Sequence, residues 1–572
     1  MGSGQLEVER KFEAGPDAVL PDLSTVDGVA TVGDVVPHEL DATYYDTPDL
    51  RLARARITLR RRTGGTDAGW HLKLPTAVAG SRREVHAPIG PRRTVVPRAV
   101  TEPVTGVLRG ARPGPVAVLQ TTRLVTPLLG DDGRVLAEVA SDTVTGTVLA
   151  AEADAPSTVT TWREIEVELV DGDEALLDAV TQALTAAGIE PSDLPSKLTR
   201  VLAGRLAALT PPPLRLPEAR GNGSGTGDGS GSGSGSGSGK KGKGKKGRKK
   251  DDEAQDARGG APTAAEVVLA AVRTQVQALL TADIGVRTGD PEGVHDLRVA
   301  CRRLRSILAA FRPVLDRTAT DPLRDELQAT GARLSAARDG EVALEHLRAV
   351  VDVQPVELVR GPVVARLQSA RVADHEKGRR AAVRALSDRR HLQLLDALDA
   401  LLTDPPLAEA AAEPAPAVLA DAVRRTGKRL QHRIAEARDA AAREAAAREA
   451  GTGAGTGAAG HEQEEHALHE VRKAAKRVRY TAEVAGPVLG APAEALVTCM
   501  KQVQDLLGEA QDTVVTRAVC TRLAAAASGA GEDTFTYGRL HALEEWRAER
   551  ADQAFWSIEP SLRSAVRAAA RT

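Results

Sequence analysis

The spacing of apolar and polar residues changes once along the chain and predicts two kinds of structure. Before about residue 210, short stretches such as ARITLRRR, WHLKLP and WREIEVELV alternate apolar and polar side chains between Gly, Pro and Asp clusters, which indicates β-strands. After about residue 262, Ala, Leu, Arg and Glu dominate and apolar residues recur every three or four positions, which indicates helices. The pattern predicts an α+β multidomain protein, with a mainly β domain at 1–210 and an all-α helical bundle at 263–572.

The composition between these two parts does not support a packed core. Residues 211–262 run from PPPLRLPEARG through Gly-Ser repeats to KKGKGKKGRKK, and they contain too few apolar side chains to fold. We predict a disordered Gly/Ser/Lys-rich linker here. Its Gly-x-Gly triplets neither follow a predicted strand nor open a helix, so they do not indicate a phosphate-binding loop.

Cysteine content and charge set the expected location and partners. The three cysteines, Cys301, Cys499 and Cys520, are an odd number without repeated spacing and fit reduced thiols in a cytosol. The chain shows no basic-then-apolar signal segment, and no uninterrupted apolar run approaches the roughly 20 residues that span a bilayer. We expect a cytoplasmic protein without a membrane partner. The net charge of -2 gives no reason to expect nucleic acid, so an anionic partner must be sought in local clusters of Lys and Arg.

Each predicted strand has one charged and one apolar face, because successive residues of a strand point to opposite sides. In LEVERKFE and WREIEVEL the acids alternate with apolar or basic residues. In ITLRRR and WHLKLP, the side chains of Arg60, Arg62 and Lys73 lie on the face opposite the aliphatic and aromatic side chains. For one strand, a charged side that faces solvent is the simplest interpretation. Across the whole set, acidic strands and basic strands at opposite ends of the domain would be explained by a sheet that closes into a barrel with its charged faces inward.

The charged faces suit a metal ion and a chain of phosphates. The paired carboxylates of the first and last strands suit a hard divalent cation, Mg²⁺ or Mn²⁺, which prefers oxygen ligands; they are Glu7, Glu9, Glu166 and Glu168. The basic side chains suit phosphates, which arginine can bind through two nitrogens; they are Arg60, Arg62, Lys73 and Arg123. Together the two sets describe a polyphosphate cradle.

These residues resemble a known family. Glu7-x-Glu9-x-Lys11 is similar to the E-x-E-x-K signature of the CYTH superfamily, the triphosphate tunnel metalloenzymes, whose fold is an antiparallel β-barrel around a polar tunnel. The resemblance spans roughly residues 4–205 and continues through YYDTPDLRLARARITLRRR, WHLKLP, TR at 122–123, SDTV at 141–144, EVEL at 166–169 and SK at 196–197. It implies that a metal-assisted water attacks a triphosphate.

By position, the resemblance implies a role for individual residues. The implied catalytic residues are Glu7, Glu9 and Lys11, and the implied metal ligands are Glu7, Glu9, Glu166 and Glu168. The implied substrate-binding residues are Arg60, Arg62, Lys73, Arg123 and Lys197, with Asp142 as a weaker candidate. Many relatives carry two consecutive basic residues where this chain has Arg123-Leu124, a departure that bears on substrate preference.

The helical part contains an internal repeat. The motif H-x-x-R-x-x-x-[RK]-R-x-R occurs first at 295–305 and again at 469–479. On a helix these positions fall within an arc of roughly 160°, so each copy forms one broad basic face. A solvated face is the default interpretation of either copy alone. Because compensating acids are scarce in both stretches and the pattern recurs, an anion with several charges is the better interpretation.

The repeated motif resembles the CHAD domain, a histidine-containing helical module that often follows CYTH in bacterial proteins and binds inorganic polyphosphate. The resemblance covers roughly residues 263–565. It implies polyphosphate-binding residues in both copies: His295, Arg298, Arg302, Arg303, Arg305, His469, Arg472, Lys473, Lys476, Arg477 and Arg479.

Two functions compete at this point. The first is a Mg²⁺- or Mn²⁺-dependent phosphohydrolase that acts on triphosphate or on the ends of inorganic polyphosphate, with the helical domain holding the polymer. The second is a non-catalytic polyphosphate-binding or granule-targeting protein. Within the enzyme hypothesis, hydrolysis of thiamine triphosphate and hydrolysis or cyclisation of ATP remain open, because the family supports them all.

Overall fold

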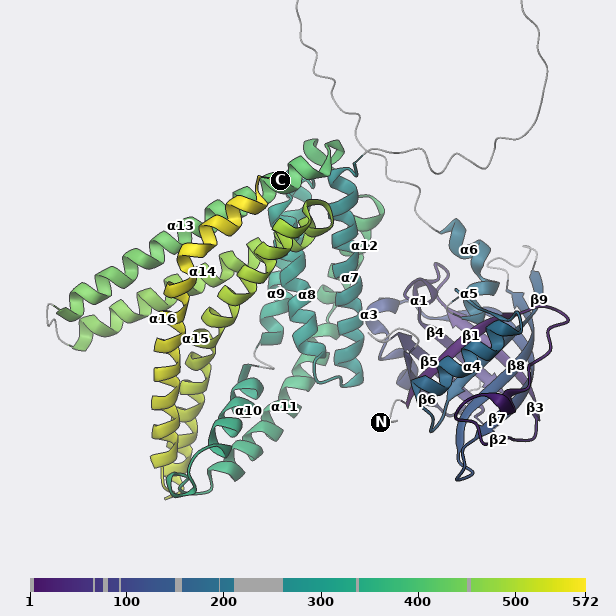
Figure 1. Ribbon diagram of the computed structural model, residues 1–572. Helices are drawn as coiled ribbons and strands as arrows, with labels where there is room; N and C mark the ends of the chain where they lie inside the picture. The colour runs from purple at the N-terminus through teal and green to yellow at the C-terminus, as the bar shows by residue number, and fades with distance from the viewer. Residues whose placement is uncertain are drawn as a thin grey trace, which may run out of the picture.

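The computed structural model of the chain (Figure 1) contains an N-terminal barrel domain and a C-terminal helical domain. It describes residues 5–64, 67–75, 81–91, 94–149, 157–194, 196–209, 261–335, 339–449 and 454–571. Of the predicted linker at 211–262, residues 211–260 lie outside the described part of the structure. The predicted fold class, an antiparallel barrel followed by a helical region, is confirmed.

The barrel is a ring of antiparallel strands. Its members are β1 (Gln5–Ala14), β3 (Val36–Asp46), β4 (Thr58–Thr63), β5 (Gly69–Pro75), β6 (Ser81–Ala87), β7 (Gly114–Leu129), β8 (Val135–Val148) and β9 (Thr158–Leu169). The hydrogen-bonded order is β1-β6-β5-β4-β3-β7-β8-β9, and β9 pairs back with β1, which closes the ring. Two short strands, β2 (Thr31–Val32) and β10 (Glu190–Pro191), pair with β7 and β1 outside this ring.

The apolar faces of the strands point outward and are covered by helices. Phe12, Ile165 and Val167 pack beneath the amphipathic helix α4 (Glu174–Ala186), which Asp173 caps by accepting a hydrogen bond from the backbone N–H of Leu176. On the opposite side, Leu59, Trp70 and Leu72 pack with the short helices α1 (Arg51–Arg54), α2 (Arg98–Thr101) and α3 (Thr105–Leu108). The charged faces are therefore left to line the interior, as the strand pattern predicted.

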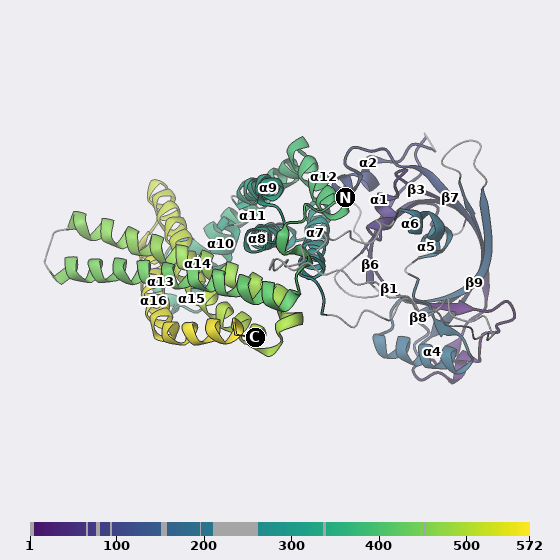
Figure 2. The same ribbon diagram turned by 90° about the horizontal axis from the view of Figure 1, so that it is seen from above.

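One end of the barrel is filled by two short helices. Viewed from above (Figure 2), α5 (Lys197–Val201) and α6 (Ala203–Ala208) lie within the ring of strands. Ser196 begins α5 as its N-cap, since its hydroxyl accepts a hydrogen bond from Thr199 N at 3.1 Å. Leu198 and Leu202 pack against Tyr44 and Val144 at this end. This packing carries Lys197, the first residue of α5, into the barrel.

The helical domain consists of long helices in two packed groups. In chain order they are α7 (Ala264–Thr288), α8 (Gly293–Ala310), α9 (Arg317–Ser335), α10 (Asp339–Asp352), α11 (Val363–Ser387), α12 (Arg389–Thr403), α13 (Ala415–Glu449), α14 (Ala454–Leu489), α15 (Ala491–Gly529) and α16 (Phe535–Ala569). The larger core is built mainly from α7, α8, α12, α13 and α14. A second core joins α10 and the start of α11 to α15 and α16 (Figure 1).

Helix α7 is an interior element of the larger core. It begins with a capping box in which Thr263 and Glu266 satisfy each other's backbone N–H groups, and it ends at Gly289, whose φ of +81° suits glycine. By length and composition it is the one described helix that could span a membrane, but core helices of soluble proteins pass the same test. Its buried Val268 and Val272 pack in the core of the helical domain.

The two domains meet through a defined contact between α3 and the helices α7 and α12. Arg109, whose side chain is 6% exposed, forms ion pairs with Asp396 at 3.1 Å and Asp399 at 2.6 Å. Ile284 of α7 packs in the outer apolar cluster of the barrel. Gly106 of α3 lies so close to Asp283 of α7 that a Cβ atom on residue 106 would be 2.5 Å from a carboxylate oxygen of Asp283.

Candidate active site and polyanion-binding surface

The barrel encloses a polar cavity of about 340 Å³. Carboxylates of β1, β8 and β9 line one half, together with Lys11, Arg123 and Lys197, and basic residues of β4, β5 and β6 line the other half, together with Asp67 and Glu84. The sequence-predicted residues that line it are Glu9, Lys11, Arg60, Arg62, Lys73, Arg123, Glu166, Glu168 and Lys197. The backbone of Glu7 lies opposite Arg82 in the β1–β6 pair, and its side chain lies outside the described part of the structure.

The register of the acidic strands places like charges side by side. Glu9 of β1 lies directly opposite Glu168 of β9, and Glu168 lies directly opposite Glu138 of β8. One step along the strands, Lys11 lies opposite Glu166. Opposite charges in such cross-strand pairs stabilise a sheet and like charges destabilise it. The row Glu9–Glu168–Glu138 therefore gathers negative charge, which Lys11 offsets in part through its ion pair with Glu9 at 3.3 Å.

Glu166, by contrast, is balanced by cations of the protein. Lys11 Nζ and Arg123 Nη2 each form a short ion pair with it, and Lys197 Nζ lies 2.7 Å from its Oε1. Arg123 also binds Asp142 through two nitrogens, at 2.8 and 2.6 Å. Burial would raise the pKa of Glu166, but the charges of Lys11, Lys197 and Arg123 outweigh it and hold the pKa well below its usual value.

The tightest group of carboxylates in the described part of the chain is filled by a lysine. Oxygens of Asp142, Glu164 and Glu166 lie within 4.8 Å of one another, a spacing that would suit a metal ion. The ammonium of Lys197 contacts all of them, at 2.9, 2.6 and 2.7 Å, and Trp162 Nε1 donates to Glu164 at 2.6 Å. A protein cation thus satisfies this group, which makes it a structural anchor for α5.

The row formed by Glu9, Glu168 and Glu138 fits a divalent cation better. Burial raises the pKa of Glu168, and the charges of Glu9 and Glu166 add to this effect against the opposing charge of Lys73. At Glu9, burial raises the pKa, but the charges of Lys11, Lys73 and Lys197 lower it by more than burial raises it. The Glu9 carboxyl group therefore stays ionised. Neighbouring carboxylate oxygens suit Mg²⁺ or Mn²⁺. Of the predicted ligands, Glu9 and Glu168 fit this role, because Glu9 has one ion pair among the described residues, with Lys11 at 3.3 Å, whereas three cations contact Glu166.

The basic half of the cavity has hydrogen-bond donors to spare. The Nε atoms of Arg60 and Arg62 are buried without a hydrogen-bond partner among the described residues. Burial, with the charges of Arg60 and Arg123, lowers the pKa of Arg62 to about 10. Because like charges are crowded here and donors are unsatisfied, an anion that accepts hydrogen bonds would stabilise this wall. Lys73 lies opposite Glu84 in the β5–β6 pair and faces the same cavity.

The structure adds site residues that the sequence did not single out. Arg82, Glu84 and Glu138 line the cavity, and Glu164 holds Lys197. Glu164 carried a signal, since it shares a strand face with Glu166 and Glu168. The sequence carried no such signal for Arg82 or Glu138, because whether their side chains enter the cavity depends on which strands pair with β6 and β8.

In the helical domain, the two copies of the basic motif meet along the contact of α8 and α14. Arg302 Nε donates to the hydroxyl of Tyr480 at 3.1 Å, and Arg303 forms an ion pair with Glu483 at 3.4 Å. The guanidinium groups of Arg303 and Arg479 lie over the Tyr480 ring, 5.5 and 4.9 Å from its centre. We use the name basic seam for the contact of α8 with α14 formed by Arg302, Arg303, Arg479, Tyr480 and Glu483, together with the basic residues beside it.

Crowded positive charge lowers pKa values along the seam. Burial, followed by the charges of Arg472, Arg302 and Arg479, lowers the pKa of Lys476 to about 7. Burial and a second group of arginines lower the pKa of Arg477 to about 10; that group is Arg429, Arg324, Arg305 and Arg312. Arg312, Arg324 and Arg429 lie outside both motif copies, on or beside α8, α9 and α13, so the repeat did not reveal them.

The remaining predicted polyphosphate residues differ in exposure and contacts. Lys473 is 55% exposed and pairs with Glu470 on its own helix. The Nδ1 atom of His469 lies 2.7 Å from Gln511, and this side chain lines a different cavity, between α14, α15 and α16. His295 is exposed near the start of α8, and Arg298 is half-buried one turn further on.

Comparison with known proteins agrees with this architecture. A model of the CYTH domain matches residues 5–202, and a model of the CHAD domain matches residues 270–521. The uncharacterized protein Rv2226 of Mycobacterium tuberculosis is 36% identical over 573 residues, which cover 99% of this chain and 98% of that protein.

Two further similarities cover single parts of the chain. The human thiamine-triphosphatase is 40% identical over 79 residues, 14% of this chain and 30% of that enzyme. The crystal structure of the CHAD domain from the plant Ricinus communis has 22% identity and a TM-score of 0.39, and covers 54% of this chain and 92% of that one. The matches in order along the chain, and the full-length relative, show that this protein belongs to the family in which a CYTH domain is followed by a CHAD domain.

Proposed function

We propose that this protein is a metal-dependent triphosphate hydrolase whose helical domain binds inorganic polyphosphate. The observation that carries the proposal is the division of the barrel cavity into an acidic and a basic half. One half has the like-charged row of Glu9, Glu168 and Glu138, and in the other the Nε–H groups of Arg60 and Arg62 have no hydrogen-bond partner among the described residues, although Arg62 also pairs with Asp67. A triphosphate together with a divalent cation supplies the charges that each half lacks. The human thiamine-triphosphatase, which resembles part of the chain, supports a triphosphate as substrate.

The glutamates of the barrel would bind the metal ion, and its arginines would bind the phosphates. Glu9 and Glu168, beside Glu138, would hold the divalent cation, which when bound polarises a phosphoryl oxygen and lowers the pKa of its bound water. Arg60 and Arg62 would donate hydrogen bonds to the phosphates and orient them.

Two lysines keep the acidic half in the ionised state. Lys11 and Lys197 hold Glu166 ionised. Burial alone would lower the pKa of Lys11, but the charges of Glu166 and Glu9 outweigh it and raise the pKa. Their positive charge also faces the cavity, where it would stabilise negative charge that develops on the leaving phosphate.

A phosphate-release assay with the full-length chain tests the enzyme proposal. The substrates would be tripolyphosphate, ATP and thiamine triphosphate, each with Mg²⁺ or Mn²⁺. We expect release that requires one of these metals. Absence of metal-dependent release from every substrate would refute the hydrolase.

That negative result would leave a second candidate, a non-catalytic polyphosphate-binding protein. Its supporting observation is that the protein itself already balances Glu166, one of the predicted metal ligands.

Polyphosphate binding by the seam can be tested through its salt dependence. Replacing Arg298, Arg302 and Arg305 by Gln should weaken polyphosphate binding and flatten its salt dependence, because fewer counterions are released, as for nucleic acids. The matched change at Arg472, Lys476 and Arg479 should act similarly, since the two copies meet at one contact. A triple variant that binds like the wild type would contradict a shared seam. The proposal includes a cytoplasmic location, which a fluorescent fusion imaged beside polyphosphate granules would test.

A further inference from the structure

Arg62, one of the two arginines assigned to the substrate phosphates, already has an anionic partner in the barrel. It forms an ion pair with the carboxylate of Asp67, and both residues line the barrel cavity. The side chain of Arg62 is 12% exposed, and that of Asp67 is 46% exposed. A carboxylate and a phosphate bind a guanidinium group through the same kind of charge-assisted hydrogen bond. Asp67 therefore occupies a position on Arg62 that a phosphate oxygen of the substrate would take.

Asp67 lies at the end of the barrel opposite α5 and α6. Leu50, which lies between β3 and β4, packs against Leu198 and Leu202 at the end that these two helices fill. Asp67 lies in the next connection, between β4 and β5, so it belongs to the opposite end of β4. Because nearly half of its side chain is in contact with solvent, the carboxylate can leave Arg62 and be solvated by water.

A buried histidine holds the backbone of Asp67 in place. The Nε2 atom of His71 lies 2.9 Å from the backbone oxygen of Asp67, and its Nδ1 atom lies 2.8 Å from the carboxylate of Glu84. A carbonyl oxygen can only accept, so Nε2 carries a hydrogen and donates to it. His71 is 2% exposed, and its hydrogen bond to the backbone does not involve the carboxylate of Asp67.

Two glycines hold the chain on either side of Asp67. A Cβ atom on Gly64 would lie 2.2 Å from the backbone oxygen of Glu39, and a Cβ atom on Gly69 would lie 2.1 Å from Nε2 of His86. Both glycines thus pack closely against neighbouring strands, β3 and β6. Because the backbone is held at these points and by His71, moving the Asp67 carboxylate away from Arg62 requires a side-chain rotation rather than a movement of the strands.

We propose that Asp67 is a specificity-determining residue, whose carboxylate holds the place of one substrate phosphate on Arg62 until a triphosphate displaces it. A single phosphate at Arg62 offers this arginine little that Asp67 does not already supply. A triphosphate also contacts the rest of the basic half, including Arg60, and these additional contacts outweigh the lost ion pair. As a product phosphate leaves, Asp67 returns to Arg62. The inference rests on the proposed function, because it takes the ligand of the barrel to be a triphosphate.

Calorimetric titration of the full-length chain with tripolyphosphate, without metal and at constant ionic strength, tests the inference in the absence of hydrolysis. The variant Asp67→Asn should bind tripolyphosphate about fivefold tighter than wild type, since the competing ion pair is lost. In a chain that also carries Arg62→Gln, the same change should have no effect, because Asp67 acts through Arg62. The compared chains share the same helical domain, so tripolyphosphate bound there cancels. An equal gain in both backgrounds, or no gain in the wild-type background, would overturn the inference.

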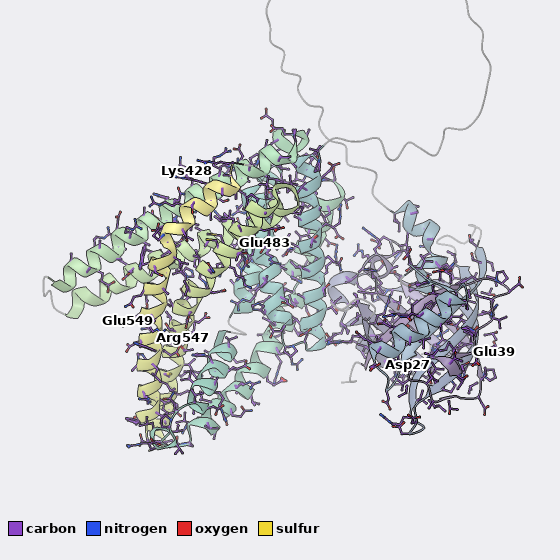
Figure 3. All side chains as sticks on the ribbon, in the orientation of Figure 1. Asp27, Glu39, Lys428, Glu483, Arg547 and Glu549 are labelled. Carbon is purple, nitrogen blue, oxygen red and sulfur yellow. The ribbon has the colours of Figure 1, made fainter. Side chains whose placement is uncertain are left out.

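Two matched variants are the controls. Asp67→Glu keeps a carboxylate beside Arg62 and should bind tripolyphosphate like wild type. Glu39→Gln removes one negative charge from an exposed position of β3 beside Gly64, and Glu39 is labelled at the edge of the barrel domain in Figure 3. This change should leave the affinity unchanged. A gain in Glu39→Gln equal to that in Asp67→Asn would show a general effect of charge and would also overturn the inference.

Kinetic measurements separate this inference from the hydrolase proposal. With metal present, Asp67→Asn should lower KM for tripolyphosphate about fivefold without raising kcat, and orthophosphate should inhibit it more strongly by about the same factor. Metal-dependent turnover without these changes would exclude the role of Asp67 and keep the hydrolase. Absence of turnover in every variant would exclude the hydrolase, and the calorimetric comparison would still decide whether Asp67 competes for Arg62.

Discussion

Lys476 should make polyphosphate binding depend on pH near neutrality. Burial and the charges of Arg472, Arg302 and Arg479 lower its pKa to about 7, so the ammonium loses its proton as pH rises through this value. A bound polyphosphate brings negative charge to the seam and favours the ammonium form, which raises this pKa again. Binding above pH 7 must therefore take up a proton, and the affinity must fall as the pH rises.

The magnitude follows from the pKa of about 7 for Lys476. If the complex keeps Lys476 protonated, each unit above about pH 7 weakens binding about tenfold, which amounts to about 30-fold between about pH 6 and about pH 8.5. The stability of the free protein should change in the opposite direction. The pKa of Lys476 in the folded protein lies below its value in the unfolded chain. The unfavourable free energy of the buried ammonium is therefore fully present below about pH 7, and it decreases as the pH rises towards the usual pKa of lysine.

The assay is the anisotropy of a labelled long-chain polyphosphate at constant ionic strength, with wild type and the variant Lys476→Gln. We expect the variant to bind more weakly at low pH, to lose most of the pH dependence, and to melt at a higher temperature than wild type below pH 7. The variant Lys473→Gln is the control, because it removes one positive charge from an exposed lysine of the same helix. Comparing variants cancels any titration of the polymer. A pH profile that survives in Lys476→Gln would refute the reasoning.

Two more predictions concern the barrel and its contact with the helical domain. Changing Glu9→Gln together with Glu168→Gln should reduce metal-dependent hydrolysis by at least about 100-fold, since both carboxylates of the like-charge pair are neutralised, while polyphosphate binding is retained. Glu39→Gln, at an exposed acid on β3, is the control, and equal activity in all three proteins would remove Glu9 and Glu168 from the site. Changing Arg109→Ala should loosen the two domains, because both ion pairs across their contact are lost, and small-angle scattering should detect a larger radius of gyration. The exposed Arg112→Ala is the control there, and an unchanged radius in Arg109→Ala would show that Arg109 does not hold the domains together.

Much of the architecture was determined by the sequence alone. A period of two in ITLRRR and WREIEVEL specifies strands with one charged face. For one strand that face could lie in solvent, but the set of acidic and basic strands indicated a barrel with its charged faces inward. The repeated motif at 295–305 and 469–479 specified two basic helix faces, because helical periodicity depends only on spacing. These are properties of neighbouring residues in the chain, and they survive whatever the rest of the molecule does.

What only the tertiary structure decided is which of these charges remain unbalanced. Glu166 and Glu168 look alike in the sequence, yet the β1–β9 register sets Lys11 opposite the first and Glu9 opposite the second. Lys197 comes into contact with Glu166 only because α5 packs within the ring of strands. Lys473 and Lys476 belong to the same motif, but one pairs with Glu470 at the surface while the other is buried among arginines. Charge compensation depends on distances of a few ångströms between residues far apart in the chain, and these distances are fixed by strand register and helix packing rather than by local sequence.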